Sequence, residues 1–219
     1  MLCQRRLGNR EVAAQLMQLF VARTDVYGVE SEKGWRTVKE SLTIRQVTDH
    51  LEGKYCLGVY PFNEKGIVKW ICIDIDFKRS MLAYSLARQL FHENCVLLED
   101  TGGRGMHVWI LLEPTPLWQA SMLVDKIKSE LTAEIFPKQR ELKPGQYGNF
   151  VRLPLGIHHR TGNRSYFLQG PPLAKLRPYQ TCKHRIYDQN GEPNCFFNYN
   201  APGFCTFENC PIKGGGFEV

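Results

Sequence analysis

Apolar residues recur every three to four positions in several parts of the chain, as they do in helices that bury one face. Asn9, Thr43 and Ser80 stand near the starts of three such segments, and their side chains are typical of N-caps. The pattern predicts four helices, at residues 9–23, 43–51, 80–92 and 117–131.

Shorter apolar runs bounded by turn-forming residues predict strands. Pro114 and Pro116 are expected to end the strand that begins at residue 106. Because strands alternate with helices but also meet in hairpins, we expect a mixed sheet and an α/β or α+β fold. The strands are predicted at residues 57–60, 68–76, 95–98, 106–112, 134–136, 149–153 and 165–168.

Two carboxylates interrupt the apolar strand at residues 68–76. Asp74 and Asp76 are two positions apart, so on a strand they point to the same face, about 6.5–7 Å from each other. Like charges at that spacing are costly unless a cation neutralises them. Hard divalent ions accept such oxygen ligands, as in two-metal phosphoryl-transfer sites. The alternative is a strand end at which both acids face water.

The turn Thr101-Gly-Gly-Arg-Gly joins two of the predicted strands. Three glycines in four positions around Arg104 exceed what a hairpin turn requires. Glycines let backbone N–H groups approach a polyphosphate, and Arg104 adds a charge-assisted contact. His107, just inside the next strand, can donate to a phosphate oxygen. The turn matches neither the Walker loop nor the dinucleotide fingerprint, and a half-buried structural histidine is the alternative for His107.

Composition and charge favour an intracellular protein with an anionic partner. The chain has 219 residues, 43% of them hydrophobic and 23% charged, and a net charge of +6. No apolar stretch approaches the roughly 20 residues of a membrane span, and the N-terminus lacks a signal-peptide core, so we expect a cytoplasmic protein. Cations and rings alternate after residue 137, which is typical of a single-stranded nucleic-acid path, although a solvated basic face beside core aromatics is the alternative. These residues are Arg140, Lys143, Arg152, Arg160, Arg164, Lys175 and Arg177, with Tyr147, Phe150, Tyr166, Phe167 and Tyr179.

The last part of the chain is rich in cysteine. After Pro172 the periodicity gives way to Pro, Asn, Gly and Cys, so we predict domains at 1–172 and 173–219. Four cysteines in a reduced compartment favour one tetrahedral zinc site, with an iron–sulfur cluster as the alternative. His184 can replace one of the cysteine ligands. The other alternative is that the four cysteines are free thiols that bind no metal. The four are Cys182, Cys195, Cys205 and Cys210.

Three segments in order, Asp74-x-Asp76, Thr101–Trp109 and Tyr147–Gly156, together resemble the archaeo-eukaryotic primase superfamily over about residues 50–170. The likeness includes its primase-polymerase branch in mobile elements and CRISPR-associated proteins. The resemblance implies a catalytic core with an RRM-like half at 1–172 and two Mg²⁺ or Mn²⁺ ions on Asp74 and Asp76. Thr101 stands where Ser is commoner in the family and keeps the hydroxyl.

The resemblance also implies a third metal-binding acid and a set of nucleotide ligands. Glu134 fits the third acid better than Glu141, which lies in a Lys/Pro/Gly-rich loop. His158 and His159 are adjacent and point in different directions, so only one is expected to take part. The nucleotide-binding residues implied are Thr101, Gly103, Arg104, His107, Arg152, His159 and Arg160.

The implied activity is that of a DNA primase and polymerase in replication. It would transfer nucleotides from NTPs or dNTPs to a 3′-hydroxyl on a single-stranded DNA template, including primer synthesis from free nucleotides. A gap-filling repair polymerase without primase activity, a non-catalytic zinc-containing nucleic-acid-binding module and a metal-dependent nuclease are the alternatives. We expect a monomer with no membrane partner, and the chain is also compatible with being one piece of a multidomain protein.

Overall fold

The computed structural model describes residues 8–31, 34–141, 143, 145–176, 185–187 and 193–195. The chain divides into two compact units, Met1–Tyr179 and Gln180–Val219. In the second unit, β10 (Arg185–Tyr187) pairs antiparallel with β11 (Pro193–Cys195). Within the described parts of the chain, no helix combines the length and apolar character that crossing a membrane requires.

The larger sheet of the first unit has five strands in the order β7-β4-β6-β5-β9. The helix α3 (Phe77–Leu90) follows β4, and α4 (Leu117–Glu130) follows β6. The segment β4-α3-β5-β6-α4-β7 is therefore a split β-α-β fold, which is the RRM-like half that the resemblance implied. The strands are β4 (Ile67–Asp76), β5 (Val96–Asp100), β6 (Gly105–Pro116), β7 (Glu134–Phe136) and β9 (Tyr166–Gln169).

The α+β class is confirmed, but the prediction of a mixed sheet is wrong. Every strand pair among the described residues is antiparallel. The crossover helix α3 makes β4 and β5 run in the same direction, and β6 is inserted between them. The parallel pair that helix–strand alternation suggested is therefore never formed.

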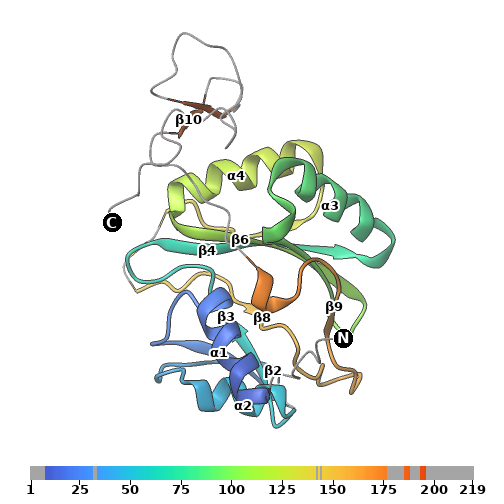
Figure 1. Cartoon of the computed structure of the whole chain (residues 1–219). Helices are drawn as coiled ribbons and strands as arrows, with labels where there is room; N and C mark the ends of the chain where they lie inside the picture. The colour runs from blue at the N-terminus through green and yellow to red at the C-terminus, as the bar shows by residue number, and fades with distance from the viewer. Residues whose placement is uncertain are drawn as a thin grey trace. The chain divides into compact units, whose positions relative to one another are not determined.

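The two faces of the larger sheet have different neighbours. Figure 1 shows α3 and α4 on one face and the N-terminal elements on the opposite side. On the side of the N-terminal elements, Phe20 of α1 packs edge-on against Trp109, with ring centroids 5.1 Å apart. Because alternate residues of a strand share a face, Asp74 and Asp76 lie on this same side as Trp70 and Cys72.

A second sheet has the strand order β2-β1-β3-β8 and lies on the side of the larger sheet opposite α3 and α4 (Figure 1). The β1–β2 hairpin is absent from the sequence-based prediction. β2 is an edge strand, and most of its residues are solvent-exposed. Its sequence therefore shows no alternation of apolar and polar positions from which a strand could be predicted. The elements here are α1 (Asn9–Phe20), α2 (Ile44–Leu51), β1 (Tyr27–Ser31), β2 (Gly34–Val38), β3 (Cys56–Val59) and β8 (Val151–Arg152).

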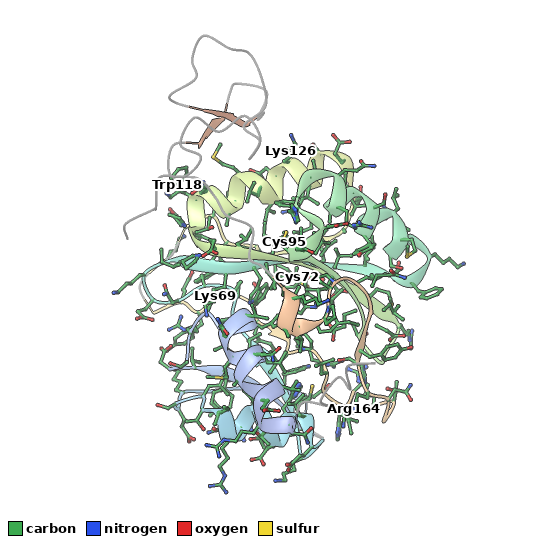
Figure 2. The ribbon with its side chains drawn as sticks, in the orientation of Figure 1. Lys69, Cys72, Cys95, Trp118, Lys126 and Arg164 are labelled. Atoms are coloured by element: carbon green, nitrogen blue, oxygen red, sulfur yellow. The ribbon has the colours of Figure 1, made fainter. Side chains whose placement is uncertain are left out.

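Three hydrogen bonds attach the end of α1 to the larger sheet. The Lys69 ammonium donates to the carbonyl oxygens of Gln18 and Val21, at 2.8 and 3.1 Å, and burial lowers its pKa (Figure 2). The Trp70 indole donates to the Phe20 carbonyl at 2.7 Å. Side chains of β4 therefore satisfy helix-end carbonyls that would otherwise lack partners.

Several predicted element ends need correction. Thr43 caps α2 as predicted, and its side chain accepts from the Arg45 N–H. Gly8, not Asn9, is the N-cap of α1, where the Glu11 side chain accepts from the Gly8 N–H. Asp76, not Ser80, holds the N-cap position of α3, and the Ser80 hydroxyl bonds back to the Phe77 carbonyl inside the helix.

The strand β6 also continues through both prolines to Pro116. Trp70 pairs with Leu111 and Val68 pairs with Thr115, so three residues of β6 stand opposite one residue of β4. Pro114 falls in this bulge, where its missing N–H removes no ladder hydrogen bond.

A buried histidine joins α2 to the loop after β8. His50 is fully buried; its Nδ1 accepts from the Leu57 N–H at 3.1 Å, and its Nε2 donates to the Pro154 carbonyl at 3.1 Å. A Cβ on Gly156 would approach the His50 ring to 2.0 Å, so this position requires glycine.

Candidate active site

One register row crosses four strands of the larger sheet. Asp74 on β4 pairs with Glu134 on β7 and with His107 on β6, and His107 pairs in turn with Glu99 on β5. Directly opposed residues on neighbouring strands share a face. The row therefore lies on the side away from α3 and α4, in the order Glu134, Asp74, His107 and Glu99.

Asp74 and Asp76 share this face at the end of β4. Asp74 is half-buried and Asp76 is exposed, and the described residues give neither carboxylate a hydrogen bond or an ion pair. Burial raises the pKa of Asp74. The nearby imidazole of His107 lowers this pKa, whereas the negative charges of Glu134 and Asp76 raise it further. A Cβ on Gly105, which is opposite Asp76, would lie 3.3 Å from the Asp74 carboxylate. Glycine at this position therefore leaves room beside the two acids.

Glu134 lies beside Asp74 in the backbone register, but its exposed carboxylate is paired with the Lys138 ammonium. Glu141, the alternative third acid, is exposed and lies 3.7 Å from the Lys143 ammonium. Across the part of the chain that the structure describes, no three His, Cys, Asp or Glu side chains are arranged to hold a metal. Two unpaired carboxylates on one face nevertheless fit a hard divalent ion, and Glu134 can join them once it leaves Lys138.

His107 is held by a residue that the sequence reasoning missed. Its Nδ1 lies 3.1 Å from Glu99 Oε2, which also accepts from the Trp109 indole at 2.6 Å. Glu99 is only 1% exposed. The sequence shows an acid directly after the apolar run 96–98, at a position that shares a strand face with Leu97. The partners of this acid lie on another strand, so the sequence alone does not reveal them.

The glycine turn is closed by its own side chains. The Thr101 hydroxyl donates to the Gly105 carbonyl at 2.6 Å and accepts from the Gly103 N–H at 3.3 Å. The Asp100 carboxylate accepts from the Gly102 N–H at 2.8 Å, and Gly102 has a φ of +72°. Two of the residues predicted to contact phosphates therefore differ: the Thr101 hydroxyl is already hydrogen-bonded within the turn, whereas the Arg104 side chain is exposed.

The loop at residues 157–164 packs on this turn. The Thr161 hydroxyl donates to the Gly102 carbonyl at 2.6 Å, and the Asn163 amide contacts the same oxygen at 3.4 Å. The His158 ring lies over Gly103, where a Cβ would approach it to 2.8 Å, and burial lowers the His158 pKa. The structure therefore brings His158, rather than the predicted His159, against the turn. Both His159 and Arg160 are exposed.

Arg152 is bound to an acid of the smaller sheet. One guanidinium nitrogen donates to Glu30 Oε2 at 3.0 Å, and the two side chains are 14% and 6% exposed. Among the described residues, Arg152 Nε is buried without a hydrogen-bond partner. The guanidinium also lies 5.6 Å from the centre of the Trp35 ring. Glu30 is the second acid that the sequence reasoning missed.

Four rings form a chain over the smaller sheet. Trp35 contacts Phe150, Phe150 contacts Tyr60, and Tyr60 contacts Tyr147, with centroids 5.0–6.0 Å apart. The Phe150 ring lies on glycines 28 and 58, where a Cβ would approach it to 3.1 and 2.5 Å. We call Trp35, Tyr60, Tyr147 and Phe150 the aromatic cluster. Two cations, Arg23 and Lys39, lie over the Tyr147 ring, at 4.9 and 5.6 Å from its centre. The Arg23 guanidinium is buried and donates to both carboxylate oxygens of Asp25, at 2.8 and 2.6 Å.

Other basic residues of the predicted nucleic-acid path have structural partners. Arg140 forms two bonds with Asp125, at 2.6 and 2.7 Å. Arg164, which is labelled in Figure 2, donates to the Leu155 carbonyl at 2.6 Å. Arg160 and Lys175 of the same predicted path are exposed, and Arg177 and Tyr179 lie outside the described residues.

The predicted zinc or iron–sulfur site lies largely outside the described residues. Cys182, His184, Cys205 and Cys210 are not described, and Cys195 is described only as the last residue of β11. The metal site at these cysteines stays a prediction. Cys56, Cys72 and Cys95 are buried free thiols, as expected for cysteines in apolar runs, and burial raises the pKa of each.

Comparisons with known proteins place this arrangement in a family. A protein-family model described as "TOTE conflict system, Archaeo-Eukaryotic Primase domain" matches residues 30–181. Among solved structures, the archaeo-eukaryotic primase domain of the cyanophage S-2L primase-polymerase is 14% identical, with a TM-score of 0.48; the match covers 76% of this chain and 90% of that one. No curated protein matches the chain. The family match spans the whole register row and the turn, loop and arginine around it, and the chain belongs to the archaeo-eukaryotic primase domains of TOTE conflict systems.

Proposed function

We propose that this domain is a nucleotidyltransferase that extends, and can begin, a nucleic-acid strand on a single-stranded DNA template. It would transfer a nucleotide from an NTP or dNTP to a 3′-hydroxyl. The observation that carries the proposal is the register row: Asp74 lies between His107 and Glu134, with Asp76 on the same face. Carboxylates and a phosphate-binding imidazole side by side suit nucleotidyl transfer.

Asp74 and Asp76 would hold Mg²⁺ or Mn²⁺, with Glu134 as the third ligand. Bound there, the ions supply Lewis-acid stabilisation of the attacking oxygen and of the pyrophosphate leaving group. Both aspartates lie at the end of one rigid strand, which fixes their separation. Gly105 leaves space for the ligands. The contribution of the chain is to hold these acids in place before substrate arrives.

The triphosphate would lie on the other side of Asp74, toward β6 and the glycine turn. His107 Nδ1 faces Glu99, and Nε2 has no hydrogen bond within the described residues. Arg104 and Arg160 are exposed cations on the turn and on the loop that packs against it. Together they can neutralise phosphate charge without deep burial of any one cation.

The template would follow the smaller sheet. Trp35 is 37% exposed and stands at the open end of the aromatic cluster. Rings bind single strands because every base presents a face on which they can stack, and nearby cations add phosphate contacts. Arg152, beside Trp35 and tied to Glu30, would position a phosphate between the two sites.

One observation favours an alternative, a nucleic-acid-binding module without catalysis. The Glu134 carboxylate is occupied by Lys138, so the third acid is not free in the structure. The pair is exposed, however, and exposed ion pairs contribute only about 0–1 kcal/mol, which a divalent ion easily exceeds. The catalytic proposal therefore stands ahead of this alternative.

The test is incorporation of labelled nucleotides on single-stranded DNA with Mg²⁺ or Mn²⁺, with and without a primer. Products in both reactions are expected. Products only with a primer would reduce the function to primer extension, as in a gap-filling polymerase. Shortened DNA without incorporation would indicate a nuclease, and binding without either reaction would indicate the non-catalytic module.

A further inference from the structure

Glu99 is a buried acid with no part in the proposed chemistry. It lies on β5, two strands away from Asp74, and is 1% exposed. A buried carboxyl group is costly unless hydrogen bonds satisfy it. One of its oxygens, Oε2, contacts both His107 Nδ1 and Trp109 Nε1, at 3.1 and 2.6 Å.

The geometry points to Glu99 as a positioning residue that fixes the imidazole of His107 for the triphosphate of the incoming nucleotide. The Trp109 indole N–H donates to Oε2, and a carboxylate in its ionised form can only accept, so the bond to the same oxygen places the proton of His107 on Nδ1. Nε2 is then the nitrogen left for a ligand. The identity of that ligand rests on the function proposed above, whereas the orientation of the ring does not.

Two further contacts limit the motion of the ring. Trp109 lies edge-on to His107, with centroids 5.5 Å apart and planes at 87°. The backbone register sets His107 opposite both Glu99 and Asp74, so the ring is confined between β5 and β4. A ring held on three sides loses little conformational freedom when a phosphate binds, which favours affinity.

The Nδ1–H tautomer makes this inference measurable. A free neutral imidazole favours the Nε2–H form, so a Nδ1–H form at alkaline pH reports the bond to Glu99. We expect ¹⁵N NMR of the wild-type His107 ring to show the Nδ1–H tautomer. Glu99→Leu should lose it, whereas Glu99→Gln, whose amide oxygen can accept both N–H groups, should keep it.

Nucleotide kinetics give the second readout. Glu99→Leu should raise the KM for the nucleotide about tenfold or more with a smaller fall in kcat, and Glu99→Gln should restore it. The control is Glu130→Leu, at an exposed position at the end of α4 on the opposite face of the larger sheet, which should keep both the tautomer and the KM. Should circular dichroism show Glu99→Leu to be unfolded, Glu99→Asp, one methylene shorter, replaces it with the same expectations.

The inference is overturned by a folded Glu99→Leu or Glu99→Asp protein that keeps the wild-type tautomer or the wild-type KM. Failure of the function proposed above looks different. In that case no variant, nor the wild type, binds or incorporates nucleotides, while the ¹⁵N spectrum still changes with Glu99.

Discussion

Asp74 on β4 stands directly opposite His107 on β6 in the antiparallel register. One residue that can bind a cation and one that can bind an anion are thereby fixed on one face of a rigid sheet. Glu134 flanks Asp74 on the other side, and Glu99 flanks His107. The sheet therefore separates the proposed metal side of the site from its phosphate side by a single strand spacing, about 5 Å.

The identity of the third acid can be tested by metal binding. Glu134→Gln should weaken Mn²⁺ binding about tenfold, or about 1.4 kcal/mol, because it removes the carboxylate beside Asp74. Lys138→Gln should strengthen binding slightly by removing the competing ammonium. Isothermal titration calorimetry with Mn²⁺ measures both changes. Glu141→Gln is the matched control, and weakening by that variant instead would make Glu141 the ligand.

The loop that packs on the glycine turn should affect nucleotide affinity. Thr161→Val keeps the shape of the side chain but removes its bond to the Gly102 carbonyl, which should cost about 1 kcal/mol of stability. We expect a raised KM for the nucleotide with little change in kcat, because the turn is less well ordered before binding. Thr132→Val, an exposed position away from this loop, is the control. Equal effects of the two variants would argue against a role for the loop.

Template binding should depend on Trp35. Trp35→Ala should weaken binding of labelled single-stranded DNA by about 1–3 kcal/mol, the usual contribution of one stacked base. The slope of affinity against salt should not change, since no phosphate contact is removed. Trp118→Ala is the matched control, because that ring is 64% exposed but lies on α4, at the opposite face of the larger sheet. Fluorescence anisotropy at two salt concentrations distinguishes these results, and equal losses in both variants would contradict a specific platform.

Stability should fall in mild acid because of His50. Burial lowers the His50 pKa to about 4, and the bond to the Pro154 carbonyl only partly opposes this. Between about pH 6.5 and 4 the unfolded chain binds a proton that the native histidine does not, so the free energy of unfolding decreases as the pH falls. The loss amounts to about 3 kcal/mol over that range. Urea unfolding across these pH values measures it, and His50→Asn should show a shallower dependence. Equal slopes in the two proteins would exclude His50 as the source.

Much of the site follows from local sequence patterns. Asp74, Asp76 and His107 were found because carboxylates and glycines interrupt apolar strands, and a strand has a fixed period. Glu134 was predicted at the start of a short strand, and β7 begins there. Local periodicity also gave the four helices, although their ends shifted by a few residues.

The supporting residues could not be found in the same way. Glu99 and Glu30 act on partners that lie on other strands, and Glu30 is 122 positions from Arg152 in the sequence. Such pairs depend on strand order, which a single sequence does not determine. Thr161 and Asn163 were missed for the same reason, since their acceptor, Gly102, belongs to another loop.

The most direct test of the central claim uses a variant that keeps the shape of the acidic pair and removes its charge. Asp74→Asn combined with Asp76→Asn should abolish incorporation of labelled nucleotides on single-stranded DNA, while the affinity for that DNA in EDTA stays within about twofold of the wild type. Loss of incorporation with intact DNA binding would support a nucleotidyl-transfer site at the end of β4. Wild-type levels of incorporation by this variant would contradict it.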